Sequence, residues 1–171
     1  MSGFAVLPLV AVLSIAGEAP TPSPLRPQSI RLQYAVDLGL RASETFRILF
    51  DALAAHRAIV LIVARPCDFG RREACLLHQV VTAGGYRFLR VNVRDDPPYV
   101  RLAALIAHEL QHALEATQAG LTDADSFERF FAAHGYICEE AHVQRCYETA
   151  QSLVMQARVV KELSREDARR R

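Results

Sequence analysis

The stretch from about residue 99 to residue 118 constrains the fold most strongly, because its apolar residues recur at helical spacing. In a helix with about 100° per residue, its apolar side chains fall on one side: Ala103, Ile106, Ala107, Leu110 and Leu114. His108 and His112 lie within about 40° of each other on the other side. The segment therefore predicts an amphipathic helix, ended by Gly120, whose polar face carries two histidines.

The residues before this helix predict a small mixed sheet. Residues 58–64 are a continuous apolar run, which suits a strand buried on both faces. Residues 75–82 and 86–94 flank Gly84-Gly85 and predict a β-hairpin. The second hairpin strand alternates, with Leu89, Val91 and Val93 facing inward and Arg90, Asn92 and Arg94 facing outward. This alternation favours an edge strand.

Three further helices are expected. Ser43 can cap a helix through about His56 whose apolar face would cover the sheet. Thr122 can cap a second through Ala133, with Asp125 in a variant of the capping box. The last helix is expected from about residue 143 to residue 163. With 171 residues, 51% of them hydrophobic, the chain fits one α+β domain with a substantial core.

The string His108-Glu109-Leu110-Gln111-His112 has the spacing of a zinc site. Two imidazoles at positions i and i+4 can bind one tetrahedral Zn²⁺, and Glu109 between them can reach a water bound to the metal as general base. The longer metzincin motif is excluded, because Glu115 stands at its glycine position and Gln118 at its third histidine. A third ligand must therefore come from further along the chain.

Glu148 is the candidate third ligand. In the expected last helix it lines up with the apolar side chains of Met155, Val159 and Leu163, where an unpaired carboxylate would be costly. A cation would offset that cost, although a partly exposed glutamate near the helix start is an alternative. His134 or His142 as third ligand also remains open, as does a zinc-binding or interaction protein without catalytic turnover.

The zinc-binding string, followed downstream by Tyr147-Glu148-Thr149-Ala150, resembles the gluzincin metallopeptidases and, in its short length, their minimal members, the minigluzincins. The resemblance implies a zincin-like sheet with a rim strand at residues 87–94, a backing helix, an active-site helix and a C-terminal glutamate helix. It implies Zn²⁺ held by His108, His112 and Glu148, catalysis by Glu109, and hydrolysis of peptide bonds. Asn92 and Val93 on the rim strand would bind a peptide or protein substrate.

A second group should stabilise the oxyanion of the reaction. Four candidates lie close to Glu148 in the sequence: His134, Tyr136, His142 and Tyr147. The sequence does not choose among them.

The beginning of the chain bears on its location. Residues 1–19 contain an apolar run followed by small residues and are expected to be a signal peptide, too short for a stable membrane span. Residues 20–42 are expected to be a proline-rich linker, and residues 43–171 the metallopeptidase domain. The protein would then be secreted or periplasmic, or cytoplasmic if the leader is retained.

Cysteines and net charge add two expectations. The pairs Cys67/Cys75 and Cys138/Cys146 suit disulfides in an exported protein, and free thiols are the alternative. With 20 basic and 19 acidic residues, the formal net charge of +1 gives no reason to expect a nucleic acid partner. The oligomeric state is not predicted.

Overall fold

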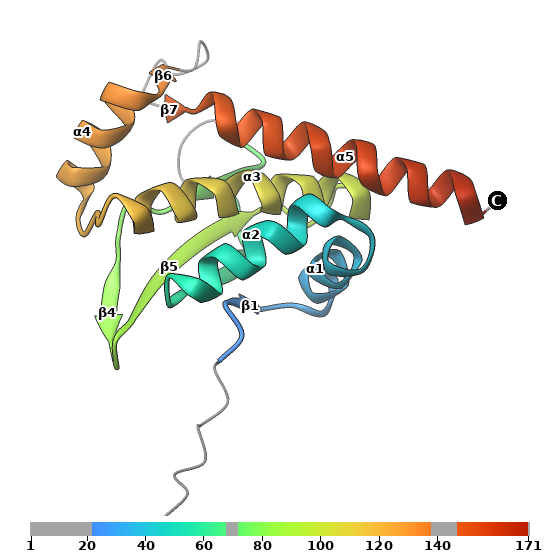
Figure 1. Cartoon of the computed structure of the whole chain (residues 1–171), viewed down its shortest axis with the longest axis horizontal. Coiled ribbons are helices and arrows are strands. Elements are labelled where there is room, and N and C mark those ends of the chain that lie inside the picture. Colours follow the sequence, from blue (N-terminus) through green and yellow to red (C-terminus); the bar gives the residue numbers. More distant parts are fainter. Residues whose placement is uncertain (1–21, 68–71, 138–146, 171) are drawn as a thin grey trace, which may run out of the picture.

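Two apolar strands at the middle of a mixed sheet organise the fold, which the computed structural model describes for residues 22–67, 72–137 and 147–170 (Figure 1). Strand β2 (Ala58–Ala64) pairs in parallel with β5 (Tyr86–Val93), and β1 (Leu25–Pro27) pairs in parallel with the other side of β2. Strands β3 (Ala74–Leu76) and β4 (Val81–Ala83) pair antiparallel with β5. With the helices described below, the protein is α+β, as predicted.

The prediction that residues 87–94 form an edge strand is wrong. β5 is bonded on one side to β2 and on the other to β3 and β4, so these two short strands form the edge on that side of the sheet. Asn92 was expected to face outward but is buried, and its Oδ1 accepts a hydrogen bond from Arg90 Nε at 3.0 Å. Alternation of polar and apolar residues depends on how the two faces are covered and does not reveal how many neighbours a strand has.

Most of the expected linker is folded, which corrects the assignment of residues 20–42. After β1, Ser29 caps helix α1 (Ile30–Ala42), and its side chain accepts a hydrogen bond from the Leu32 N–H. The helix buries Leu32, Ala35, Val36 and Gly39. The linker was predicted because this segment is rich in proline. An outermost strand such as β1 nevertheless tolerates proline, because the missing N–H can be on the side that pairs with no other strand.

Helix α2 (Glu44–Ala55) follows α1 without a linker and confirms the helix expected to start at Ser43. Ser43 ends one helix and begins the next: its N–H donates to Gly39 O, and its side chain accepts from Phe46 N. A Cβ atom on Gly39 would lie 2.5 Å from the Phe46 ring, so glycine lets the two helices meet closely. The α1–α2 corner is therefore part of the core.

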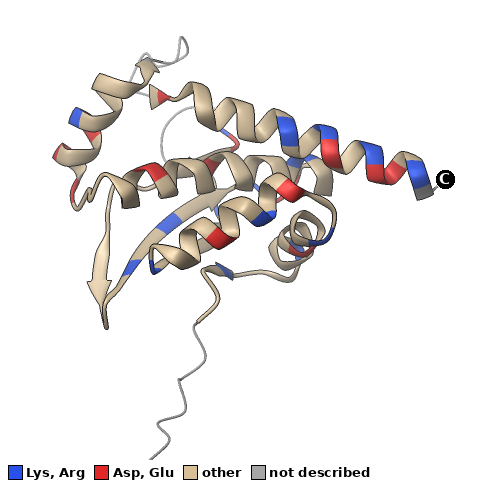
Figure 2. Cartoon of the chain, in the orientation of Figure 1, with Lys and Arg blue, Asp and Glu red and all other residues tan. Residues whose placement is uncertain are grey.

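Helix α3 (Tyr99–Gln118) lies between the sheet and α5 (Ala150–Arg170), which crosses it on the side away from the sheet (Figure 1). Every residue from Leu102 to Leu114 is buried. Its polar face is therefore covered as well, which the amphipathic pattern did not indicate. Figure 2 shows basic and acidic residues alternating along the second half of α5.

The segment that follows α3 differs in detail from the prediction. Helix α4 (Ala124–His134) is capped by Asp123 and not by Thr122, with Ser126 completing the capping box. Strands β6 (Tyr136–Ile137) and β7 (Tyr147–Glu148) then form a short antiparallel pair. The last helix was expected from residue 143 but begins at Ala150, so Glu148 precedes it.

Several expectations concern the chain ends and the cysteines. The signal peptide assigned to residues 1–19 and the pair Cys138/Cys146 lie outside the described residues. Cys67 and Cys75 form a disulfide between the segment after β2 and the middle of β3. Within the described ranges, no helix combines the length and apolar character that crossing a membrane requires.

Candidate metal centre

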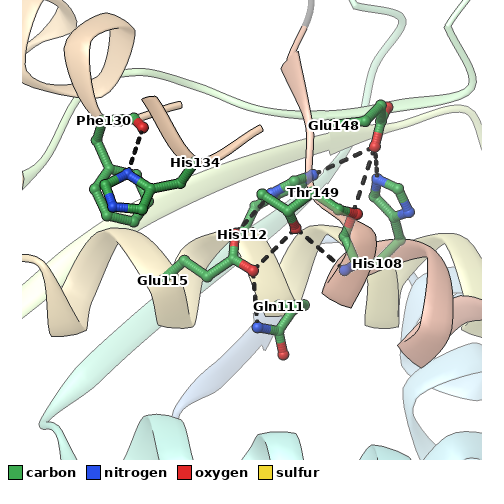
Figure 3. Close-up of polar contacts among 9 residues, drawn as sticks. His108, Gln111, His112, Glu115, Phe130, His134, Glu148 and Thr149 are labelled. Atoms are coloured by element: carbon green, nitrogen blue, oxygen red, sulfur yellow. Dashed lines mark hydrogen bonds and ion pairs between the residues drawn. The ribbon is translucent and has the colours of Figure 1, made fainter. Parts of the chain in front are cut away.

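The two histidines of the motif lie one helical turn apart on α3. Each is 6% exposed, and their ring centroids are 4.9 Å apart. Figure 3 shows both rings facing Glu148: His108 Nε2 lies 2.8 Å and His112 Nε2 3.6 Å from Glu148 Oε2. The structure thus brings the three predicted ligands together, although Glu148 comes from β7 and not from a helix.

The β6–β7 pair and the start of α5 hold Glu148 in place. Tyr136 is the register partner of Glu148 on β6. Just before β6, a Cβ atom on Gly135 would lie 2.7 Å from the Glu148 backbone oxygen, so the close approach of β7 requires glycine. On the other side, Thr149 caps α5, because its Oγ1 accepts a hydrogen bond from the Ser152 N–H at 3.2 Å.

The donor set suits a zinc ion. One ligand atom from each of His108, His112 and Glu148 can be chosen so that all three lie within 4.8 Å of one another. Ligand atoms of a tetrahedral zinc site, with bonds of about 2.0–2.2 Å, stand about 3.4 Å apart. Two imidazoles and one carboxylate on a partly open cleft are also the ligands that catalytic zinc sites use, with a further position left for water. The residues therefore fit the metal that the sequence predicted.

Glu109 is the buried carboxylate next to this group. It is 5% exposed and borders the same cleft as His112 and Glu148. Burial raises the pKa of Glu109 above its ordinary value, against the opposing charges of His108 and His112. A carboxylate whose pKa is raised toward neutrality is better suited to accept and then return a proton.

A second carboxylate, Glu115, contacts the back of His112. Its Oε2 lies 3.2 Å from His112 Nδ1, and its Oε1 accepts hydrogen bonds from Gln111 and Thr149, both at 2.9 Å (Figure 3). Burial alone would lower the pKa of His112, but hydrogen bonds to Glu115 and Glu148 outweigh it and raise this pKa to about 9. Burial alone would raise the pKa of Glu148. Its hydrogen bonds with His108 and His112 outweigh this effect and hold the pKa well below its usual range.

Comparison of the chain with protein family models, with curated proteins and with solved structures found no match. The resemblance to gluzincins therefore rests on the zinc-binding string and on Glu148.

The cleft is also lined by residues that the sequence did not assign to the site. β3 forms one wall with Ala74, Cys75 and Leu76, and the other additional lining residues are Arg72, His78 and Phe131. The His78 ring stacks on Phe127, with ring centroids 5.0 Å apart. The residues of β3 line the cleft because β3 pairs with β5. In the sequence, only the pair Cys67/Cys75 indicated that the segment containing β3 is held near the sheet.

The predicted substrate residues Asn92 and Val93 are not in this cleft. Both belong to the central strand β5, where Asn92 pairs with Val63 on one side and Cys75 on the other. Their backbone groups are already bonded within the sheet, so they cannot pair with a peptide. This assignment is therefore wrong, and β3 takes the outer position.

The four oxyanion candidates fall in different places. Tyr147 borders the cleft. His134 stacks on Phe130, with its Nδ1 2.8 Å from the Phe130 backbone oxygen, apart from the three ligands (Figure 3). Tyr136 is 49% exposed, and His142 lies outside the described residues.

Proposed function

We propose that this protein is a zinc-dependent peptidase. The observation that carries the proposal is the group of His108, His112 and Glu148 beside the buried carboxylate of Glu109 in one cleft. Structural zinc sites are closed by four protein ligands, whereas a catalytic site keeps a position for water. Three donors among the described residues, together with an adjacent base, favour the catalytic class.

Each residue has a distinct part in the proposed reaction. His108, His112 and Glu148 would hold the ion. When bound, zinc supplies a Lewis acid that polarises the scissile carbonyl and makes water a better nucleophile at neutral pH. Glu109 takes the proton of the attacking water and returns it to the leaving amine nitrogen. Burial raises the pKa of Glu109, which makes its carboxylate a stronger base toward the attacking water.

The outer edge of β3 supports a peptide as the substrate. Glu73 O accepts from Arg94 N and Leu77 N donates to Arg90 O, so these two residues face β5. In an antiparallel pair the alternate residues, Ala74 and Leu76, turn their backbone groups to the outer side. No strand of the described sheet pairs with this edge. An extended peptide could add to it as a further strand.

Tyr147 is the proposed donor to the oxyanion, because among the four candidates it is the described one that borders the cleft. Tyr147→Phe removes only the hydroxyl. We expect kcat for peptide cleavage to fall about 100-fold or more with little change in KM, as for loss of one oxyanion donor. Steady-state kinetics on the wild type and the variant measure this, and an unchanged kcat would remove Tyr147 from the mechanism.

The proposed function is tested by incubating the zinc-loaded protein with a broad pool of unstructured peptides and identifying the products by mass spectrometry. We expect the wild type to cleave peptides and Glu109→Gln to keep one zinc per chain while losing cleavage. If the zinc-loaded wild type cleaves none of the pool, a zinc-binding protein without turnover becomes the better description. If Glu109→Gln cleaves as well as the wild type, Glu109 is not the base.

A further inference from the structure

Glu115 contacts two parts of the site at once. It lies three residues after His112 on α3, and its side chain is 14% exposed. One carboxylate oxygen faces His112 Nδ1 at 3.2 Å. The other accepts a hydrogen bond from Thr149 Oγ1, the hydroxyl of the residue that follows Glu148, at 2.9 Å. Each oxygen therefore contacts a different part of the metal centre.

The contact with His112 fixes which ring nitrogen can bind the metal. When His112 Nδ1–H donates to Glu115, the lone pair is on Nε2, which is the nitrogen that faces Glu148. His108 has no corresponding support: its buried Nδ1 has no hydrogen-bond partner within the described part of the chain. Among the described residues, Glu115 therefore orients the ring of His112, and no carboxylate contacts Nδ1 of His108.

The contact with Thr149 reaches the third ligand. Thr149 follows Glu148 directly and caps α5, since its Oγ1 also accepts a hydrogen bond from the Ser152 N–H. The histidines come from α3, whereas Glu148 comes from β7, and the hydrogen bond between Glu115 and Thr149 joins these two segments directly. Gln111 Nε2 donates to the same oxygen at 2.9 Å and holds the carboxylate against α3.

We propose that Glu115 is a positioning residue, which orients His112 for zinc and holds Glu148 at ligand distance through Thr149. This inference rests on the zinc-binding part of the proposed function and not on peptide cleavage. Glu115→Gln keeps the size of the side chain but replaces one of the two accepting oxygens by an NH₂ group, so it must lose one contact.

Loss of zinc affinity has to be separated from loss of fold stability. Glu162 provides a matched control, because it also joins α5 to another helix through hydrogen bonds but contacts Ser43 and Thr45, outside the cleft. Thr149 provides a second pair of variants. Thr149→Ser keeps the hydroxyl for Glu115, whereas Thr149→Val keeps the shape and removes it.

The experiment measures the zinc Kd of each full-length variant by competition with a chelator, at a temperature where circular dichroism shows all of them folded. We expect Glu115→Gln to raise Kd about 10–100-fold, the usual effect of removing a partner of a ligating histidine. Thr149→Val should raise Kd by a smaller factor, while Thr149→Ser and Glu162→Gln should stay within about twofold of the wild type. The visible spectrum of Co²⁺-loaded protein should change for Glu115→Gln and not for Glu162→Gln.

The outcomes separate the two proposals. A wild type that binds zinc, with a Kd for Glu115→Gln within about twofold of it, overturns the positioning role and leaves the proposed function intact. A wild type that binds no zinc overturns both. A wild type that binds zinc but cleaves no peptide overturns the peptidase alone, because the positioning role is measured by metal affinity.

Discussion

Glu148 places a carboxylate against two buried imidazole rings, and its backbone position decides whether the three groups can share one ion. Gly135 contributes to that position from the neighbouring strand pair, although it carries no side chain to bind anything. A Cβ atom there would lie 2.7 Å from Glu148 O and 2.9 Å from Phe131 O. Two backbone oxygens cannot both move away easily, so any larger residue must displace β7.

Gly135→Ala should therefore lower zinc affinity without changing a ligand. We expect the zinc Kd to rise about tenfold or more, because a shift of a few tenths of an ångström moves Glu148 relative to the histidines. Gly84→Ala is the control: Gly84 has φ +57°, so alanine is strained there, but nothing lies within 4 Å of its Cβ position. Equal zinc affinities in Gly135→Ala and the wild type would contradict this role.

At the scale of elements, α5 contacts α3 along its length and also packs on α2 and α1. Glu162 supplies a polar connection in this layer. Ser43 Oγ donates to its carboxylate at 2.5 Å, and Thr45 donates through its backbone N–H at 3.1 Å and its Oγ1 at 2.8 Å. A carboxylate from one helix thereby satisfies donors at the N-terminus of another, where the helix dipole also favours negative charge.

Glu162→Gln should destabilise the fold in a pH-dependent way. Burial opposes the shift, but hydrogen bonds from Ser43 and Thr45 lower the pKa of Glu162 below 4.5. Its contribution is therefore present above the unfolded pKa and is lost as pH falls through the folded pKa. We expect the variant to lose about 1–2 kcal/mol of unfolding free energy at pH 7, and less than that below pH 4. Urea denaturation of the wild type and the variant at both pH values measures the difference between their unfolding free energies. A difference that is larger at the lower pH would contradict this prediction.

For the whole molecule, the sequence was most informative where a pattern is local. Helices α2 and α3 and strand β2 lie within a residue or two of their predicted bounds, because capping residues and continuous periodicity specify them. The order of strands is not local. Strand β2 pairs in parallel with β5, which makes β5 central and places β3 at the edge. The alternation of residues 87–94 does not indicate this pairing.

The same contrast between local and non-local features applies to the candidate site. His108, Glu109 and His112 are specified by one helix and could be found from their spacing. Glu148 was nominated because it aligned with an apolar helical stripe, yet it lies on β7 before the helix starts and reaches the histidines through strand pairing. The cleft wall formed by β3 could not be predicted, since it exists only when that short strand is paired with β5 and joined by the Cys67–Cys75 disulfide.

The central claim is that His108, His112 and Glu148 hold one zinc ion, and elemental analysis of the purified chain tests it most directly. We expect one zinc per chain in the wild type and in His134→Ala, because His134 is not part of the ligand group in the described residues. Glu148→Ala should lose stoichiometric zinc while circular dichroism shows that it remains folded. A folded Glu148→Ala that keeps one zinc per chain, or a wild type that holds none after exposure to zinc, would contradict the account.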